Sequence, residues 1–162
     1  MSEFRFEKIR VPAELTLASG AVVAGIFFVA GSASGHHGRE RVGDLLNERP
    51  GFFPFERADG TTALYNRAQL VMVALTAPAG EATTEPGFDV AKKLRVTMLL
   101  STGTRLSGTV PVYRPYGRER LSDYAQTPES FRYLLTAERE LLVNAAHVVE
   151  LRETEEKESE DR

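Results

Sequence analysis

The chain contains no cysteine among its 162 residues. This absence excludes disulfides, cysteine-ligated zinc and catalysis by a thiol. No apolar run approaches the ~18 residues that a membrane-spanning helix needs, so we expect no membrane segment. The opening residues, MSEFRFEKIR, mix charges with aromatic side chains and lack the basic-then-apolar pattern of a secretory signal. The absence of a secretory signal predicts a cytoplasmic protein.

The sequence also lacks a surplus of positive charge. Its net charge is −3, whereas proteins that bind nucleic-acid phosphates usually show a basic excess. Hydrophobic residues make up 42% of the chain and charged residues 27%, which suffices for one core or two small ones. The composition is therefore typical of a globular protein and does not by itself indicate an RNA-binding one.

Signatures of catalysis are missing as well. The chain has no P-loop and no dinucleotide-binding fingerprint. Ser19, Ser101 and Ser107 lie in or beside predicted turns, and no histidine or aspartate is placed to activate them. His36 and His37 share a loop of small residues, whereas a metal site draws its ligands from rigid elements. We therefore predict a protein that is not an enzyme, with no catalytic residue, metal, cofactor or small-molecule substrate.

Strand patterns dominate the first half of the chain. Residues 5–30 alternate and are rich in β-branched and aromatic side chains around a turn at 18–20, which predicts a hairpin. Val42, Leu45 and Leu46 have helical spacing, and Pro50-Gly51 ends that segment. Strand character then resumes from residue 52, with Asp59-Gly60 as a second hairpin turn.

The same order of features then repeats. Four landmarks recur at offsets of 83, 79, 79 and 78 positions: a turn glycine (Gly20 and Gly103), RERVGDLLN and RERLSDYAQ, PGFFPF and ESFRYL, and an asparagine-led strand (LYNRAQLVMVAL and LLVNAAHVVEL). Such internal similarity indicates a tandem duplication of one small β-rich unit. We predict a first unit at 1–78, a linker at 79–92, a second unit at 93–152 and an acidic solvated tail at 153–162.

The repeated unit resembles the Sm-like family, and in particular its bacterial Hfq-like members. RVPAELTLASGAVVAGIFFVAG at 10–31 is similar to the first Sm motif, and LYNRAQLVMV at 64–73 stands in the place of the second. The resemblance implies an all-β protein of two tandem Sm-like five-stranded small barrels. The helical spacing adds a short helical insertion after the second strand of each unit, where the usual Sm pattern has only a loop. Glycines inside strands, Gly25 and Gly108, would permit the sharp bends or close approaches that such units need.

The resemblance also implies interaction through strand edges, since Sm-like subunits join the fourth strand of one to the fifth of the next. Two copies in one chain can pair with each other and leave two outer edges. These either pair between chains or are covered by the inserted helices. We accordingly predict a scaffold or binding module acting through protein–protein contacts, as a homo-oligomer or with a protein partner. Aromatic residues near the insertions are predicted to be core, namely Phe52, Phe53, Phe55, Phe131 and Tyr133.

Binding of single-stranded RNA is the alternative function. Carried over from the second Sm motif, its candidate residues are Asn66, Arg67 and Asn144, although either asparagine also suits a tight turn that it bonds itself. The repeated GRER sequences add arginines that can meet phosphate or an acidic partner, although alternating charges usually form a solvated helix face. These are Arg39, Arg41, Arg118 and Arg120.

Overall fold

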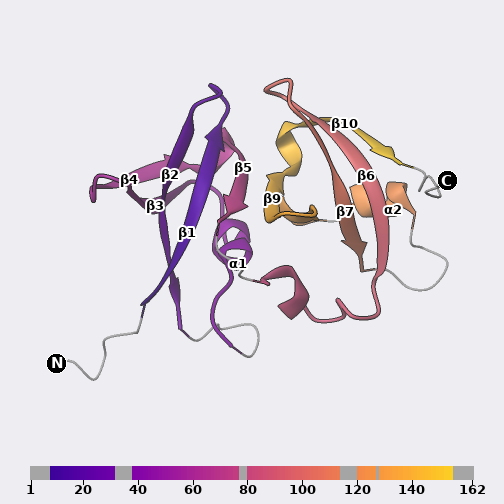
Figure 1. Ribbon diagram of the computed structural model, residues 1–162, viewed down its shortest axis with the longest axis horizontal. Coiled ribbons are helices and arrows are strands. Elements are labelled where there is room, and N and C mark those ends of the chain that lie inside the picture. The colour runs from indigo at the N-terminus through magenta and orange to yellow at the C-terminus, as the bar shows by residue number, and fades with distance from the viewer. Residues whose placement is uncertain (1–7, 32–37, 77–79, 114–119, 127, 155–162) are drawn as a thin grey trace.

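The computed structural model describes residues 8–31, 38–76, 80–113, 120–126 and 128–154 of the chain. Its strands form one antiparallel sheet in the order β10-β6-β7-β8-β9-β5-β1-β2-β3-β4, with β4 and β10 on opposite sides of the molecule (Figure 1). The prediction of an all-β fold is therefore confirmed. The strands of the two halves form one unclosed sheet and not a closed barrel, so the expected two tandem five-stranded barrels are not confirmed.

Each half of the chain has the same order of strands, with its fifth strand beside its first. The first half holds β1 (Lys8–Leu17), β2 (Val22–Ala30), α1 (Val42–Asn47), β3 (Phe52–Arg57), β4 (Thr62–Asn66) and β5 (Leu70–Leu75). The second half holds β6 (Lys92–Leu100), β7 (Arg105–Val112), α2 (Leu121–Ala125), β8 (Phe131–Leu135), β9 (Glu140–Asn144) and β10 (Val148–Glu153). Short 3-10 turns are η2 (Arg67–Gln69), η3 (Ala82–Thr84) and η4 (Ala145–His147). The predicted helical insertions thus lie after the second strand of each half.

Glycine inside a strand permits a close backbone approach in both halves. A Cβ atom on Gly25 of β2 would lie 2.1 Å from the carbonyl oxygen of Glu56 in β3. A Cβ atom on Gly108 of β7 would lie 2.6 Å from the carbonyl oxygen of Leu135 in β8. No other residue fits such spacing without moving the backbone, so glycine allows the second and third strands to meet.

Part of the segment predicted as a linker, residues 79–92, is packed into the protein. Glu81 and Ala82 are fully buried at the start of η3. The carboxylate of Glu140 in β9 accepts hydrogen bonds from their backbone N–H groups, at 3.0 Å for Glu81 and 2.7 Å for Ala82. This contact ties the segment to the second half of the sheet.

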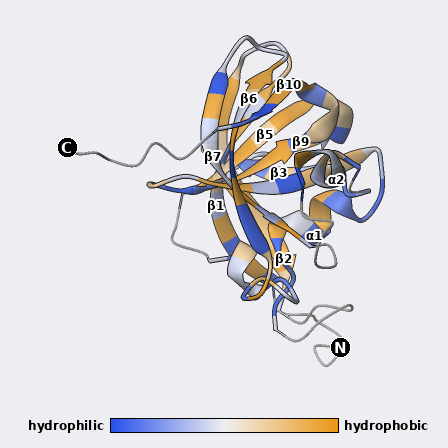
Figure 2. Ribbon diagram, turned by 90° about the vertical axis from the view of Figure 1, so that its right-hand side faces the viewer, coloured by the Kyte–Doolittle hydropathy of each residue, from blue (hydrophilic) through white to orange (hydrophobic). Residues whose placement is uncertain are grey.

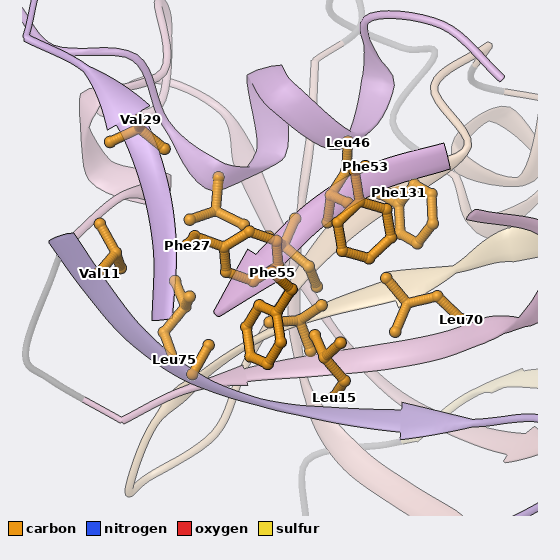
Figure 3. Close-up of a cluster of buried hydrophobic side chains, with 14 of the residues drawn as sticks. Val11, Leu15, Phe27, Val29, Leu46, Phe53, Phe55, Leu70, Leu75 and Phe131 are labelled. Carbon is orange, nitrogen blue, oxygen red and sulfur yellow. The ribbon is translucent and has the colours of Figure 1, made fainter. Parts of the chain in front are cut away.

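Two hydrophobic clusters form the core, and the central strands β5 and β9 supply side chains to both. Figure 2 shows hydrophobic residues along these two strands. Side chains alternate across a strand, so Val73 and Leu75 face one side of the sheet and Ala74 the other. The alternation is interrupted near Val71, where the register between β5 and β1 shifts. Leu70, Val73 and Leu75 of β5 join the first cluster, drawn in part in Figure 3, and Val71 and Ala74 join the second. β5 and β9 are therefore buried on both faces.

Candidate strand-edge binding site

The junction between the two halves is the antiparallel pair of β5 and β9. Val73 lies opposite Leu142 and Met72 opposite Val143. Leu142 belongs to the first cluster, whereas its neighbours Leu141 and Val143 belong to the second. The fourth strand of the second half therefore places a side chain in the core of the first half.

An aromatic side chain strengthens the same junction. Phe131 of β8 lies in the first cluster, where Figure 3 shows it beside Phe53 and Leu46 of the other half. Asn47, at the end of α1, fixes its backbone on both sides: Asn47 Nδ2 donates to the Phe131 carbonyl at 2.9 Å, and the Phe131 N–H donates to Asn47 Oδ1 at 2.8 Å. The second half thus places the side chain of Phe131 in the core of the first half, and Asn47 holds its backbone there.

Two polar side chains of the second half also bridge the junction. The buried Asn144 donates from Nδ2 to the carbonyls of Leu70 at 2.9 Å and Arg67 at 3.3 Å, while its Oδ1 accepts from the Ala146 N–H at 3.0 Å. His147 Nε2 lies 2.8 Å from the Ala68 carbonyl. Because a carbonyl can only accept, Nε2 carries the proton. Both residues bind η2 of the first half.

Near the outermost strands of the described sheet, exposed residues correspond to residues that are buried at the junction. Leu64 lies in β4 and Val149 in β10, whereas Phe52 lies in β3, opposite Asn66 of β4. Offsets of 78 and 79 positions relate each pair. Phe131 at the junction is 3% exposed, whereas its counterpart Phe52 is 58% exposed. The same contrast separates Leu142 (0%) from Leu64 (66%), and Val71 (0%) from Val149 (66%). Phe52 is therefore not core, which corrects the prediction made from its aromatic character.

Arg67, a predicted RNA contact, is buried against helix α1. Its Nε donates to the Leu46 carbonyl at 3.1 Å, and its two terminal nitrogens donate to the carbonyls of Phe52 at 2.8 Å and Leu45 at 2.9 Å. The guanidinium also lies over the ring of Phe53, 5.6 Å from its centre. A helix leaves its last carbonyls without internal partners, so Arg67 serves as a side-chain cap for α1.

Asn66 and Asn144 occupy equivalent turns but have different surroundings. Each side-chain oxygen accepts from the N–H two residues later, at 3.0 Å in both cases, which is the local role that suits asparagine at a turn. Only Asn144 also reaches across a junction with its Nδ2 group. Among the described residues, the structure gives the Nδ2 group of Asn66 no corresponding acceptor at the β4 edge.

The predicted arginines of the first GRER sequence are engaged inside the protein. Arg41 is buried and pairs with Asp44, Nε to Oδ2 and one terminal nitrogen to Oδ1, both at 3.1 Å. That ion pair holds the pKa of Arg41 above its ordinary value against the opposing effect of burial. Arg39 lies 3.7 Å from the carboxylate of Glu81. The expectation of a solvated helix face is thus wrong for Arg41.

Glu81 is the centre of a buried polar cluster that sequence reasoning missed. Its carboxylate accepts from the N–H of Val42 at 2.9 and 3.0 Å and from the hydroxyl of Tyr133 at 2.9 Å. Burial raises the pKa of Glu81 above its ordinary value, while these donors and Arg39 act in the opposite direction. The cluster joins α1, η3 and β8, so it is a structural tie between the halves.

Other predicted residues have simpler placements. The carbonyl of Arg120 accepts from the N–H of Tyr124 at 3.0 Å at the start of α2. Arg118, His36 and His37 lie outside the described residues. In the described part of the chain, no group of three or more histidines and carboxylates is arranged to hold a metal ion, and no helix is long and apolar enough to cross a membrane.

Comparisons with known proteins identify no relative. Neither the scan of family models nor the searches of curated proteins and of solved structures found a match to this chain.

Proposed function

We propose that this protein is a non-catalytic binding module that acts through its two outer strand edges, β4 and β10. An edge strand presents N–H and C=O groups that can pair with another chain, and strand addition of this kind is a common mode of protein recognition. The observation that carries the proposal is the exposure of Phe52, Leu64 and Val149 at positions whose counterparts are buried at the junction. Single exposed hydrophobic residues are ordinary. Here, however, Leu64 lies in β4, Val149 lies in β10, and Phe52 of β3 pairs with Asn66 of β4.

We propose further that each half is an Sm-like unit. Support comes from the shared order of five strands, from the close approaches at Gly25 and Gly108, and from the sequence motifs. Fold alone does not determine function, so the binding role rests on the edges and not on the resemblance. A protein partner, including another copy of the chain, is the expected ligand.

A photocrosslinking residue at position 64 tests the proposal in cells. We expect ultraviolet light to convert the Leu64→benzoylphenylalanine protein into protease-sensitive adducts of higher mass. The matched control carries the same residue at Val90, which is 87% exposed but lies outside both edges. Equal adduct patterns at 64 and 90, or no adducts at 64, would contradict the proposal.

Single-stranded RNA remains the alternative ligand and is tested by the same experiment. Adducts at position 64 that disappear with ribonuclease would favour it, as would affinity for U- or A-rich strands that falls steeply with salt. The contacts of Arg67 do not favour this alternative, because its three nitrogens already donate to carbonyls of the protein.

A further inference from the structure

A shallow groove of about 200 Å³ runs along the β10 edge of the second half. Its lining includes Ala125 of α2, Arg132 of β8, and Val148 and Val149 of β10. The groove is an open counterpart of a site that is filled in the first half. Ala125, Arg132 and Val148 correspond by the repeat to Leu46, Phe53 and Leu70.

Phe131 fills that site in the first half. It belongs to the same cluster as Leu46, Phe53 and Leu70, and Figure 3 shows it beside the first two. The residue equivalent to Phe131 is Phe52, which is exposed at the opposite edge of the molecule, next to β4. Each molecule therefore carries an unfilled groove at one edge and an exposed phenylalanine at the other.

We infer that the partner is a second copy of this chain, joined head to tail so that β4 of one copy pairs with β10 of the next and Phe52 enters the β10 groove. This inference rests on the proposed function and names its partner. The register is that of the junction, with each residue replaced by its counterpart 78 positions away. The pair of Val73 and Leu142 predicts that Leu64 of one copy lies opposite Leu151 of the next. The pair of Met72 and Val143 predicts that Tyr65 lies opposite Glu150.

Polar groups of the two edges suit the same arrangement. Asn144 donates across the junction to the carbonyls of Arg67 and Leu70. In the intermolecular pair, Asn66 Nδ2 donates to the corresponding carbonyls, those of Ala145 and Val148 in the next copy. β4 reads TALYN and carries no charge, so it brings no like charge against Glu150, Arg152 or Glu153 of β10.

Single cysteines test both the pairing and its direction, because the natural chain contains none. The Leu64→Cys and Leu151→Cys proteins are purified separately, then treated with diamide alone and as a mixture. We expect disulfide-linked dimers in the mixture and none in either protein alone. A mixture of Val90→Cys and Leu151→Cys is the matched control and should give no dimer. Adding Phe52→Lys to the Leu64→Cys protein should reduce the yield of dimer.

Two results would overturn the inference. One is a mixture that yields no more dimer than the Val90→Cys control. The other is Leu64→Cys protein that dimerises by itself as well as in the mixture, which would show identical edges pairing with each other. If either occurs while position 64 still crosslinks a different protein in cells, the proposed function stands and only the identity of the partner is wrong. If crosslinking also fails, both are wrong.

Discussion

The inner junction and the outer edges of this protein are made from corresponding residues in opposite circumstances. At the junction, Phe131 and Leu142 of the second half lie in the core of the first. At the edges, Phe52 and Leu64 carry the same kinds of apolar surface into solvent. The difference teaches that each unit buries its fourth strand only when another unit supplies a fifth. Among the described residues, this need is satisfied once, at the junction of β5 and β9, and neither β4 nor β10 has a second neighbouring strand.

The largest expected effect separates Phe131 from Phe52. We expect Phe131→Ala to lower the free energy of unfolding by about 3–5 kcal/mol, because it removes a buried ring and leaves a cavity. Phe52→Ala should change the stability of the dilute chain by about 0.5 kcal/mol or less, as for a typical surface site. Urea denaturation of both variants checks this. Equal losses would show that the two positions are not buried as described.

Arg67 sharpens the comparison between a structural and a binding role. Arg67→Ala should cost about 2–3 kcal/mol, since it removes charge-assisted hydrogen bonds to α1 and leaves buried carbonyls without donors. Arg105→Ala, which removes an exposed arginine of β7, is the control and should have little effect. Thermal or urea unfolding measures both. Unchanged stability of the Arg67→Ala protein would contradict the structural role of Arg67, and RNA binding would again be a possible role for this residue.

The paired asparagines give a smaller contrast. Asn144→Ala should cost about 1–3 kcal/mol, because it leaves the carbonyls of Arg67 and Leu70 unpaired inside the junction. Asn66→Ala should cost about 1 kcal/mol in the dilute chain, as for the loss of a single cap. Denaturation at low protein concentration compares them. A greater loss for Asn66 would contradict the assignment of the junction role to Asn144.

The smallest expected effect is a pH dependence at the tie between the halves. Burial raises the pKa of Glu81. The folded chain therefore keeps the proton of the Glu81 carboxyl group at pH values where the unfolded chain has released it. The contribution of Glu81 to the free energy of unfolding is therefore present below its unfolded pKa of about 4.5, and it is lost as the pH rises through its folded pKa. Glu85, whose pKa is also raised by burial, acts in the same direction.

Glu81→Gln should make the stability of the folded chain fall less steeply as the pH rises. The fall should not disappear, because Glu85 remains. The groups that face Glu81, namely Val42, Tyr133, Arg39 and Glu140, are unchanged in the variant. Urea unfolding midpoints across the acid-to-neutral range measure the slope. Parallel curves for the natural chain and the variant would exclude Glu81 as a source.

Local features of the fold could be predicted from the sequence, and long-range ones could not. The turn at Asp59-Gly60 was predicted from its residue types, and Gly60 has the positive φ of 89° that such a turn requires. Residues 79–92 were predicted as a linker because their composition is typical of one. The burial of Glu81 depends on Val42 and Tyr133, which lie 39 and 52 positions away in the chain.

The site shows the same division. The resemblance to Sm-like proteins predicts roles for Asn66, Arg67 and Asn144, which lie at the turns that follow β4 and β9. It did not show that Arg67 caps a helix 21 positions away. The residue type of Phe52 predicted burial, but residue type does not tell which surface buries a side chain. In the structure, Phe131 is buried in the first cluster, whereas the equivalent Phe52 is exposed.

The mass of the purified chain in solution tests most directly whether the outer edges behave like the junction. A single chain has a mass of 17.9 kDa. We predict that sedimentation at rising concentration gives a larger, whole-number multiple of this mass, and that Leu64→Lys returns the protein to a single chain. A mass of 17.9 kDa at every concentration, unchanged by Leu64→Lys, would contradict the prediction.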